Sequence, residues 1–108
     1  MSKTQQRKGR AGELELARIL REHGYPVRTG DALNFGGEPD LVGLDGVHCE
    51  VKRHEGEALT QWLKQAREDS EKFGDGLPAV FWRRNRGKWV VCMELADWLE
   101  LYAGQKVL

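Results

Sequence analysis

Two strand-like segments in the middle of the chain carry charged side chains in an unusual pattern. Asp40 begins the first segment, and Glu50 and Lys52 lie two residues apart in the second. The segments, residues 40–44 and 47–53, predict a β-hairpin in which Glu50 and Lys52 point to the same face. A carboxylate beside an ammonium is an ordinary ion pair, but with a second carboxylate from the neighbouring strand it becomes a candidate site for a divalent cation.

The length of the hairpin loop decides where Asp40 points. With a two-residue loop, Asp45-Gly46, Asp40 lies opposite Val51 and the two acids point to opposite faces. With a three-residue loop in which Gly46 has a positive φ, Asp40 lies opposite Glu50. The candidate cation site therefore requires the three-residue loop or a bulge with the same effect.

The remaining sequence alternates between helical and strand-like patterns. Helices are predicted over residues 9–23 and 58–73, and a final amphipathic helix carries Leu95, Trp98, Leu99 and Tyr102. The other predicted segments are a short strand over residues 25–28, a loop over 29–38, a break over 74–78 and a strand pair over 79–82 and 88–93. The order α-β-β-β-α-β-β-α predicts an α/β (α+β) fold with helices packed on a sheet.

The length of 108 residues is that of one small domain. We expect a single domain over residues 1–108, with residues 1–8 as a frayed or partner-ordered basic arm. The sequence has no apolar run of membrane-span length and no signal-like start, which predicts a cytoplasmic location without membrane contact. Cys49 and Cys92 are expected to be buried free thiols. The lack of a C-x-x-C pair and the scattered histidines argue against a structural zinc site.

A further carboxylate lies on the apolar side of the first predicted helix. Glu13 shares the i, i+3, i+4, i+7 stripe with Leu16, Ala17 and Leu20. Burial of a carboxylate is costly unless the group is paired or bound to a cation. The alternative is an acid in the first helical turn that interacts with the helix dipole and stays partly hydrated. The charged residues of the predicted hairpin favour the first interpretation.

These residue types match the chemistry of phosphodiester hydrolysis, which needs a cation to neutralise developing negative charge and to activate water. Carboxylate oxygens suit Mg²⁺, for which Mn²⁺ can substitute. The expected ligands are Asp40, Glu50 and the backbone carbonyl of Val51, with Glu13 binding through water or helping to hold a second ion. Lys52 would orient the attacking water and stabilise the developing charge. The alternative for the E-x-K triplet alone is a salt bridge on an exposed strand.

Charged residues are numerous but balanced, with 17 basic and 17 acidic side chains and a formal net charge of zero. Neutrality alone does not indicate a nucleic-acid partner. The basic residues nevertheless gather in two acid-free stretches that could follow a phosphate backbone, or could be a solvated chain end and hairpin tip. The candidates are Lys3, Arg7, Lys8 and Arg10 in the first stretch and Arg83, Arg84, Arg86 and Lys88 in the second. Arg53 and His54 could also meet a phosphate, or could form an exposed strand end.

Together these motifs resemble the PD-(D/E)XK nuclease superfamily, and more closely the small phage and bacterial proteins related to archaeal Holliday-junction resolvases. The resemblance covers most of the chain. Its segments are residues 8–13 (KGRAGE), 37–43 (GEPDLVG), 48–53 (HCEVKR), 62–66 (WLKQA) and 78–86 (PAVFWRRNR), followed by a strand and a helix. The resemblance implies a restriction-endonuclease-like core with a mixed central β-sheet flanked by helices.

The resemblance also implies site residues and partners. The catalytic residues would be Glu13, Asp40, Glu50 and Lys52, with Gln65 of the following helix beside the site; the alternative for Gln65 is an ordinary solvated glutamine. It implies Mg²⁺-dependent DNA cleavage that leaves 5′-phosphate and 3′-hydroxyl ends, and a homodimer, because two symmetric nicks require two sites. Archaeal resolvases are strongly basic, whereas this chain is neutral, a difference that concerns the junction substrate more than the nuclease activity.

We therefore expect an endonuclease for branched DNA such as a Holliday junction. The alternatives within the same fold are a restriction, nicking or repair nuclease and a non-catalytic DNA-binding module, although a pure binder gains nothing from acids that face phosphates. A protein-interaction domain is a further alternative, with the aromatics of the last helix as its contact face; otherwise Trp98 and Tyr102 are expected to be core or dimer contacts. His48 falls on the face of Glu50, in a supporting or exposed position.

Overall fold

The computed structural model describes residues 3–31 and 37–106, without the side chains of residues 3–6, 105 and 106. Its elements are α1 (Lys3–Glu22), β1 (Arg28–Thr29), β2 (Leu41–Val42), β3 (Val47–Arg53), α2 (Leu59–Phe73), β4 (Leu77–Arg83), β5 (Val90–Cys92) and α3 (Leu95–Lys106). The predicted order and the α/β (α+β) class, a mixed sheet flanked by helices, are confirmed. None of the described helices has the length and apolar character needed to cross a membrane.

The central sheet has three strands in the order β3-β4-β5. β3 and β4 are parallel, with Glu50 opposite Val80, whereas β4 and β5 are antiparallel, with Val80 opposite Cys92. Parallel neighbours need a long crossover connection, and α2 forms it between the end of β3 and the start of β4. β3 is consequently an edge strand, and its free edge is available to the segment that carries Asp40.

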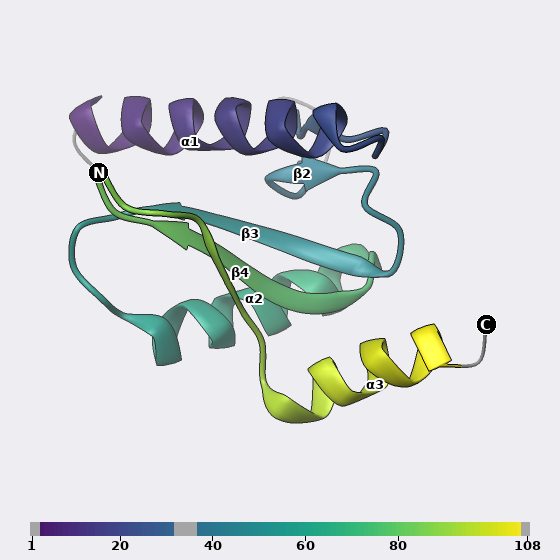
Figure 1. The fold of residues 1–108 in the computed structure, drawn as a ribbon. Coiled ribbons are helices and arrows are strands. Elements are labelled where there is room, and N and C mark those ends of the chain that lie inside the picture. Colours follow the sequence, from purple (N-terminus) through teal and green to yellow (C-terminus); the bar gives the residue numbers. More distant parts are fainter. Residues whose placement is uncertain (1–2, 32–36, 107–108) are drawn as a thin grey trace.

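Helices α1 and α2 cover opposite faces of the central sheet (Figure 1). The core on the α1 side contains Leu16, Ala17, Val27, Leu41, Cys49, Val51, Ala79 and Phe81. The core on the α2 side contains Trp62, Ala66, Val80 and Trp82. Because successive residues of a strand point to opposite faces, Glu50 lies on the α2 side, where it is only 5% exposed. β3 is thus buried on both faces, and Glu50 and Lys52 share the face of α2.

The predicted pairing of residues 40–44 with residues 47–53 in a β-hairpin is wrong. β2 pairs with β1 in a separate antiparallel sheet, with Thr29 opposite Leu41, rather than with β3. Gly43 explains this pairing: it has φ 108°, and a Cβ at this position would lie 2.2 Å from the carbonyl oxygen of Pro26. Only glycine allows this close approach and backbone conformation, which hold β2 against the segment that follows α1.

The turn before β3 has two central residues, Asp45 and Gly46, rather than the expected three. Val47 N–H donates to the Leu44 carbonyl at 3.2 Å. Gly46 has φ 81°, so its predicted positive φ is confirmed. A two-residue loop was expected to point Asp40 and Glu50 to opposite faces of a hairpin. That argument does not apply to Asp40, because β2 pairs with β1 and not with β3.

Several element boundaries also differ from the prediction. α1 begins at Lys3, so residues 3–8, expected to be a frayed arm, are helical. The first strand is Arg28–Thr29 rather than residues 25–28, and β4 begins at Leu77, inside the expected break. Gly74 ends α2 in the left-handed conformation and donates to a carbonyl of the last turn, as a glycine C-cap does. Residues 32–36 of the predicted loop lie outside the described residues.

The two cysteines are free, as predicted, although only Cys49 is fully buried and Cys92 is partly exposed. Burial raises the pKa of the Cys49 thiol to about 12. Cys49 is therefore a packing residue of the α1 side of the core and not a nucleophile at neutral pH.

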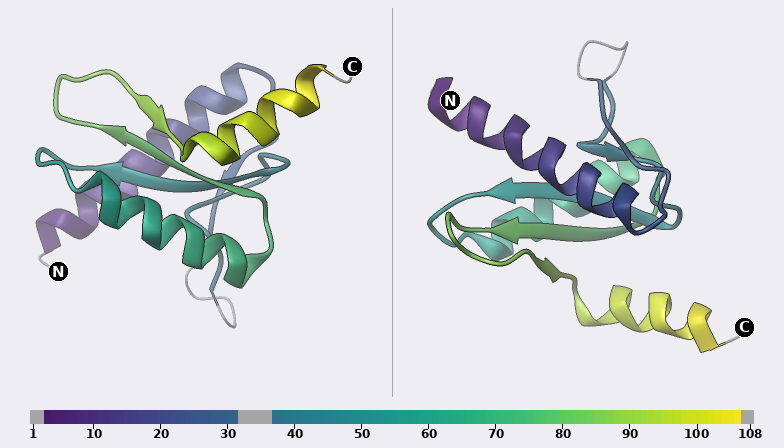
Figure 2. Two further views of the ribbon diagram at one scale, coloured as in Figure 1. Left: turned by 90° about the horizontal axis from the view of Figure 1, so that it is seen from below. Right: turned by 45° about the horizontal axis from the view of Figure 1, so that its top comes forward.

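Helix α3 projects from the end of β5 beyond the rest of the sheet (Figure 2). Asp97 is buried and accepts a hydrogen bond from Arg67 of α2, which anchors the start of the helix. Trp98 and Tyr102 stack on each other with ring centroids 5.0 Å apart, yet they are 45% and 46% exposed. The expectation that these aromatics belong to the core is therefore wrong for the single chain, and a dimer contact stays a prediction.

Candidate active site

The candidate site forms at the free edge of β3. Glu50 and Lys52 project from this strand on the α2 side, with Lys52 Nζ 3.7 Å from Glu50 Oε2. Asp40 approaches the same edge from the segment before β2, close enough for the charges of Glu50 and Lys52 to act on its carboxylate. The fold therefore brings these three residues together as predicted, although by a different strand pairing.

Asp40 is fixed by the backbone of β3. Val51 N–H donates to Asp40 Oδ2 at 2.8 Å, so the carboxylate satisfies a backbone group on the free edge of the strand. Burial raises the pKa of Asp40 to about 7, and the charge of Glu50 acts in the same direction. A buried carboxylate that faces a second one is an arrangement that a cation stabilises.

The position of Asp40 depends on a close approach at Gly30. Gly30 N–H donates to the Asp40 carbonyl at 2.9 Å. A Cβ at position 30 would lie 1.7 Å from the carbonyl oxygen of Pro39. Glycine is therefore needed here for space, because any larger residue would meet the backbone that precedes Asp40.

Replacement of Gly30 by alanine is expected to displace Pro39 and Asp40 and to lower both stability and the DNA cleavage that the resemblance implies. A clash between two backbones is relieved only by moving one of them, and we expect a decrease of about 1–3 kcal/mol in the free energy of unfolding. Denaturant unfolding and a cleavage assay would measure the two effects. Gly9→Ala is the matched control: among the described residues, a Cβ at position 9 meets no atom within 4 Å, and α1 should gain about 1 kcal/mol. Equal stability and activity of the two variants would show that the approach at Gly30 is unimportant.

Gln65 of α2 lies beside the catalytic candidates. Lys52 Nζ donates to Gln65 Oε1 at 3.0 Å, so the amide restricts the orientation of the ammonium. The two side chains border a surface pocket of about 360 Å³ between β3 and α2, which is lined by Lys52, Gln61, Trp62, Lys64, Gln65 and Glu68. Gln65 is itself exposed, so its side chain combines the hydrogen bond to Lys52 with contact to solvent.

Glu13 lies on α1 with its side chain 21% exposed and its Oε1 3.6 Å from Arg10 Nη1. Burial raises the pKa of Glu13, the charge of Arg10 opposes this shift, and the charge of Glu50 adds to it. Glu13 is thus within the electrostatic field of the site, while Arg10 compensates part of its charge.

A buried histidine lies on the other side of Glu50. His48 is 1% exposed, so the exposed alternative for this residue is wrong. His48 Nδ1 lies 2.9 Å from the Asp75 carboxylate, and Nε2 lies 3.4 Å from Glu50 Oε1. Burial alone would lower the pKa of His48, but the hydrogen bonds to Glu50 and Asp75 outweigh it and raise the pKa. The expected supporting position next to Glu50 is where the structure places it.

Asp69 and Asp75 are two acids that the sequence analysis did not single out and that the structure places beside Glu50 and His48. Asp69 lies on α2, where burial and then the charge of Glu50 raise its pKa. The sequence does carry a signal for Asp69: it follows Trp62 and Ala66 at the i, i+4, i+7 spacing of the apolar stripe, and an acid at such a position needs a partner. Asp75 follows α2 in a loop and carries no comparable signal.

The donor set at the site fits a divalent cation. Asp40, Glu50 and the Val51 carbonyl offer the hard oxygen atoms that Mg²⁺ prefers, and Mg²⁺ needs few protein ligands because it keeps several waters. Within residues 3–31 and 37–106, however, the three side chains whose ligand atoms all lie within 4.8 Å of one another are His48, Glu50 and Asp69. Glu50 therefore belongs to two groups of potential ligands, one on each side of its carboxylate.

A comparison with protein-family models matches residues 4–107 to a family described as "Phage putative PDDEXK endonuclease". The chain belongs to this family. The match includes Asp40, Glu50 and Lys52, the residues that approach one another at the edge of β3. No curated protein and no solved structure matches the chain.

In this PDDEXK family member, two of the basic candidates for DNA contacts form ion pairs and hydrogen bonds within the protein itself. Arg83 Nε and Nη2 donate to the Glu15 carboxylate at 2.8 and 3.0 Å. Arg53 Nη1 lies 3.9 Å from the same carboxylate, and Arg53 Nη2 donates to Asn85 Oδ1 at 2.7 Å. The hydrogen bond from Arg83 is the largest cause of a lowered pKa of Glu15. These pairs connect α1 with the ends of β3 and β4, so both arginines have a structural role whatever else they contact.

The two basic stretches lie toward the same end of the molecule (Figures 1 and 2). Glu55 joins them: Lys8 Nζ lies 3.9 Å from its carboxylate, and Asn85 N–H donates to it at 2.7 Å. The Arg84 guanidinium lies 4.4 Å from the centroid of the Trp82 ring. The exposed candidates at this basic end are Arg7, Arg10, Arg84, Arg86 and Lys88. The side chain of Lys3 lies outside the described residues.

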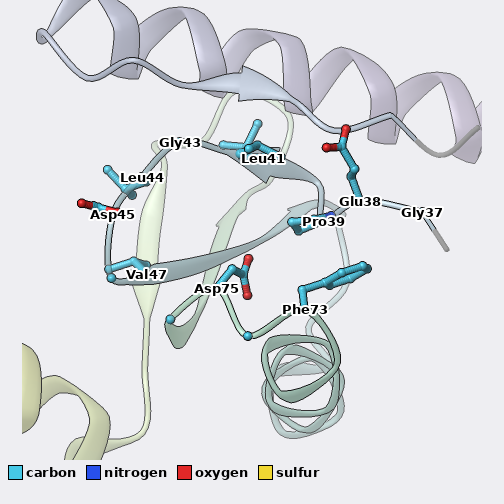
Figure 3. Close-up of a pocket in the computed structure, with 14 residues that line it drawn as sticks. Gly37, Glu38, Pro39, Leu41, Gly43, Leu44, Asp45, Val47, Phe73 and Asp75 are labelled. Carbon is cyan, nitrogen blue, oxygen red and sulfur yellow. The ribbon is translucent and has the colours of Figure 1, made fainter. Parts of the chain in front are cut away.

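A larger pocket of about 620 Å³ lies at the opposite end of β3, between the turn before this strand and the loop after α2 (Figure 3). Leu44 and Asp45 line it from the turn, and Phe73 and Asp75 line it from the end of α2. The Phe73 ring lies nearly parallel to that of His48, with centroids 6.5 Å apart. The pocket thus reaches Asp75, on the outer side of the His48 ring.

Proposed function

We propose that the chain is a Mg²⁺-dependent, structure-selective DNA endonuclease that hydrolyses phosphodiester bonds in branched DNA such as a Holliday junction. The observation that carries this proposal is the convergence of Asp40, Glu50 and Lys52 at the edge of β3 in a member of the PDDEXK endonuclease family. Mn²⁺ would substitute for Mg²⁺, because both ions accept carboxylate and carbonyl oxygens.

Each residue has a role that follows from its position. Asp40, Glu50 and the Val51 carbonyl would hold the cation, with Glu13 contributing through water. The bound cation supplies charge neutralisation at the phosphate and acidifies water. Lys52, held by Gln65 at 3.0 Å, would orient the attacking water and stabilise the charge that develops on the phosphate. Gln65 acts through Lys52 and is a positioning residue in this scheme.

We propose that the basic end of the molecule binds the DNA backbone next to the site. Replacement of Arg84 or Arg86 by glutamine is expected to weaken DNA binding and to reduce the slope of log K against log salt by about one for each phosphate that the variant no longer neutralises. Fluorescence anisotropy over a salt series would measure both quantities. Arg18→Gln is the control, because Arg18 is an exposed arginine of α1 that pairs with Glu22. Salt slopes that match the wild type in both test variants would exclude this turn as a DNA-binding surface.

Two further features complete the proposal. The exposed apolar residues of α3 would form the contact of a homodimer, which supplies the two sites that symmetric cleavage of a junction requires. The enzyme would act in the cytoplasm of a bacterial or phage-infected cell.

A restriction, nicking or repair nuclease of the same family is the second candidate. The net charge of zero favours it, together with the pairing of Arg53 and Arg83 to Glu15, because both reduce the positive charge available to a large branched substrate. This candidate shares the catalytic residues and differs only in the DNA that is cleaved.

The decisive experiment compares cleavage of four-way junction, flap, nicked and linear duplex DNA with Mg²⁺ and with a chelator. We expect cleavage of the four-way junction with Mg²⁺ and none with the chelator. Preferential cleavage of another substrate would favour the second candidate. DNA binding without cleavage of any substrate, with Mg²⁺ or Mn²⁺, would contradict the nuclease proposal and favour a non-catalytic binding module.

A further inference from the structure

A second group of potential metal ligands lies on the α2 side of Glu50. The ligand atoms of His48, Glu50 and Asp69 all lie within 4.8 Å of one another, and the group combines two carboxylates with an imidazole. His48 is 1% exposed and Glu50 is 5% exposed. Asp69 is only partly buried, so the group is closed toward the sheet and open toward solvent on the side of Asp69.

The hydrogen bonds of His48 fix which ring nitrogen faces this group. Both oxygens of the Asp75 carboxylate lie 2.9 Å from His48 Nδ1, and a carboxylate only accepts, so Nδ1 carries a proton. In the neutral imidazole the lone pair is then on Nε2, which lies 3.4 Å from Glu50 Oε1. A nitrogen lone pair thus faces a carboxylate oxygen in a buried place, and an additional proton or a metal cation must lie between them.

Asp75 is the second observation that points to a metal. Asp75 lies outside the three-residue group. Its carboxylate binds His48 Nδ1, the ring nitrogen that points away from this group. Histidine ligands in metal sites almost always donate the other ring N–H to a carboxylate, a carbonyl or water, which fixes the tautomer and the orientation of the ring. The Asp75–His48 pair has this arrangement, with Nε2 left as the ligand atom.

The two oxygens of Glu50 point to different partners. Oε1 lies 3.4 Å from His48 Nε2, and Oε2 lies 3.7 Å from Lys52 Nζ. Oε1 can therefore bind a cation next to His48, while Oε2 faces Lys52 and the proposed substrate.

We propose that His48, Glu50 and Asp69 form a second cation site, separate from the site formed by Asp40 and the Val51 carbonyl and sharing Glu50 with it. An imidazole nitrogen with carboxylate oxygens suits a divalent transition metal such as Mn²⁺ or Co²⁺ better than Mg²⁺. Binding of a cation at this site requires no DNA and no cleavage, so the inference goes beyond the proposed nuclease activity.

Metal binding to the intact, metal-depleted chain tests the inference directly. Free Mn²⁺ would be followed by electron paramagnetic resonance, and Co²⁺ by its visible absorption. We expect two Mn²⁺ ions per wild-type chain, of which Asp69→Asn removes one and Asp40→Asn removes the other. Glu71→Gln, a change at an exposed acid of the same helix, should keep both ions. Asp75→Asn should weaken the second site by about 10- to 100-fold, and His48→Gln should abolish the Co²⁺ absorption.

Two results would overturn the inference: a single Mn²⁺ per wild-type chain that Asp69→Asn retains, or equal Mn²⁺ affinities in Asp69→Asn and Glu71→Gln. Circular dichroism of each variant checks the fold, and Asp69→Asn still tests the site if His48→Gln does not fold, because Asp69 is only partly buried. No DNA is present in these titrations. Failure of DNA cleavage would therefore count against the proposed function and leave the metal stoichiometry as an independent result.

Discussion

Lys52→Ala is expected to reduce DNA cleavage by about 10²- to 10⁴-fold while the fold and DNA binding are largely retained. The ammonium lies between Glu50 Oε2 at 3.7 Å and Gln65 Oε1 at 3.0 Å, so it is held at the edge of the acidic group. Its removal takes away the positive charge that would stabilise the phosphate during the reaction. The side chain is partly exposed and supports no part of the hydrophobic core, so truncation should cost little stability.

Single-turnover cleavage at saturating enzyme concentration would separate this effect from DNA affinity. Lys72→Ala is the matched control, because Lys72 is an exposed lysine in the last turn of α2 that lies over the Phe73 ring and not against Glu50. Gln65→Ala should produce a smaller decrease in the cleavage rate, since it frees the ammonium without removing it. Cleavage by Lys52→Ala at the rate of Lys72→Ala would refute the assigned role.

Asp40→Asn is expected to abolish cleavage and at the same time to stabilise the metal-free protein at neutral pH. Burial and the charge of Glu50 raise the pKa of Asp40 from 3.8 to about 7. Between these two pH values the folded state holds more protons than the unfolded state. The free energy of unfolding therefore falls as the pH rises through this range, and the decline is complete above pH 7. Asparagine has no charge to bury, and its side-chain oxygen can still accept the Val51 N–H.

The magnitude follows from the same shift. It corresponds to on the order of 2–4 kcal/mol in the metal-free protein above pH 7. Denaturant unfolding from pH 4 to pH 8 with a chelator should show a decline in the wild type and a smaller decline in Asp40→Asn. Mg²⁺ should raise the stability of the wild type and have little effect on the variant. Asp45→Asn changes an exposed acid of the neighbouring turn and should follow the wild type. A wild-type profile that is flat or rises over this range would contradict the buried, uncompensated state of Asp40.

Most of the candidate site residues could be predicted from the sequence, because they are charged residues within strand-like or apolar helical patterns. Glu50 and Lys52 were placed on one face by the alternation of a strand, and Glu13 was found as an acid on an apolar helical stripe. The same argument applied to Asp69 would have found it as well. Helices were predicted well because their signal is local: the spacing of apolar residues in α2 and the glycine that ends it both lie within the segment itself.

Strand pairing was predicted less well because it depends on segments that are distant in sequence. The sequence favoured a hairpin between neighbouring segments, but close backbone approaches at Gly30 and Gly43 fix β2 against β1 instead. The predicted loop length was therefore wrong, and it had no consequence for the site. Asp40 reaches β3 through its side chain, by the bond to Val51 N–H, and not through a strand ladder.

The sequence by itself determined which reactive side chains the chain carries, the two acids and the lysine, and the order of the elements around them. The tertiary structure decided what surrounds these groups. It placed Asp75 behind His48, Asp69 beside Glu50 and Glu15 against Arg83. Each of these contacts joins residues that are far apart in the chain or lie on different elements. Local patterns report which face a side chain takes, whereas its partner depends on how whole elements pack against one another.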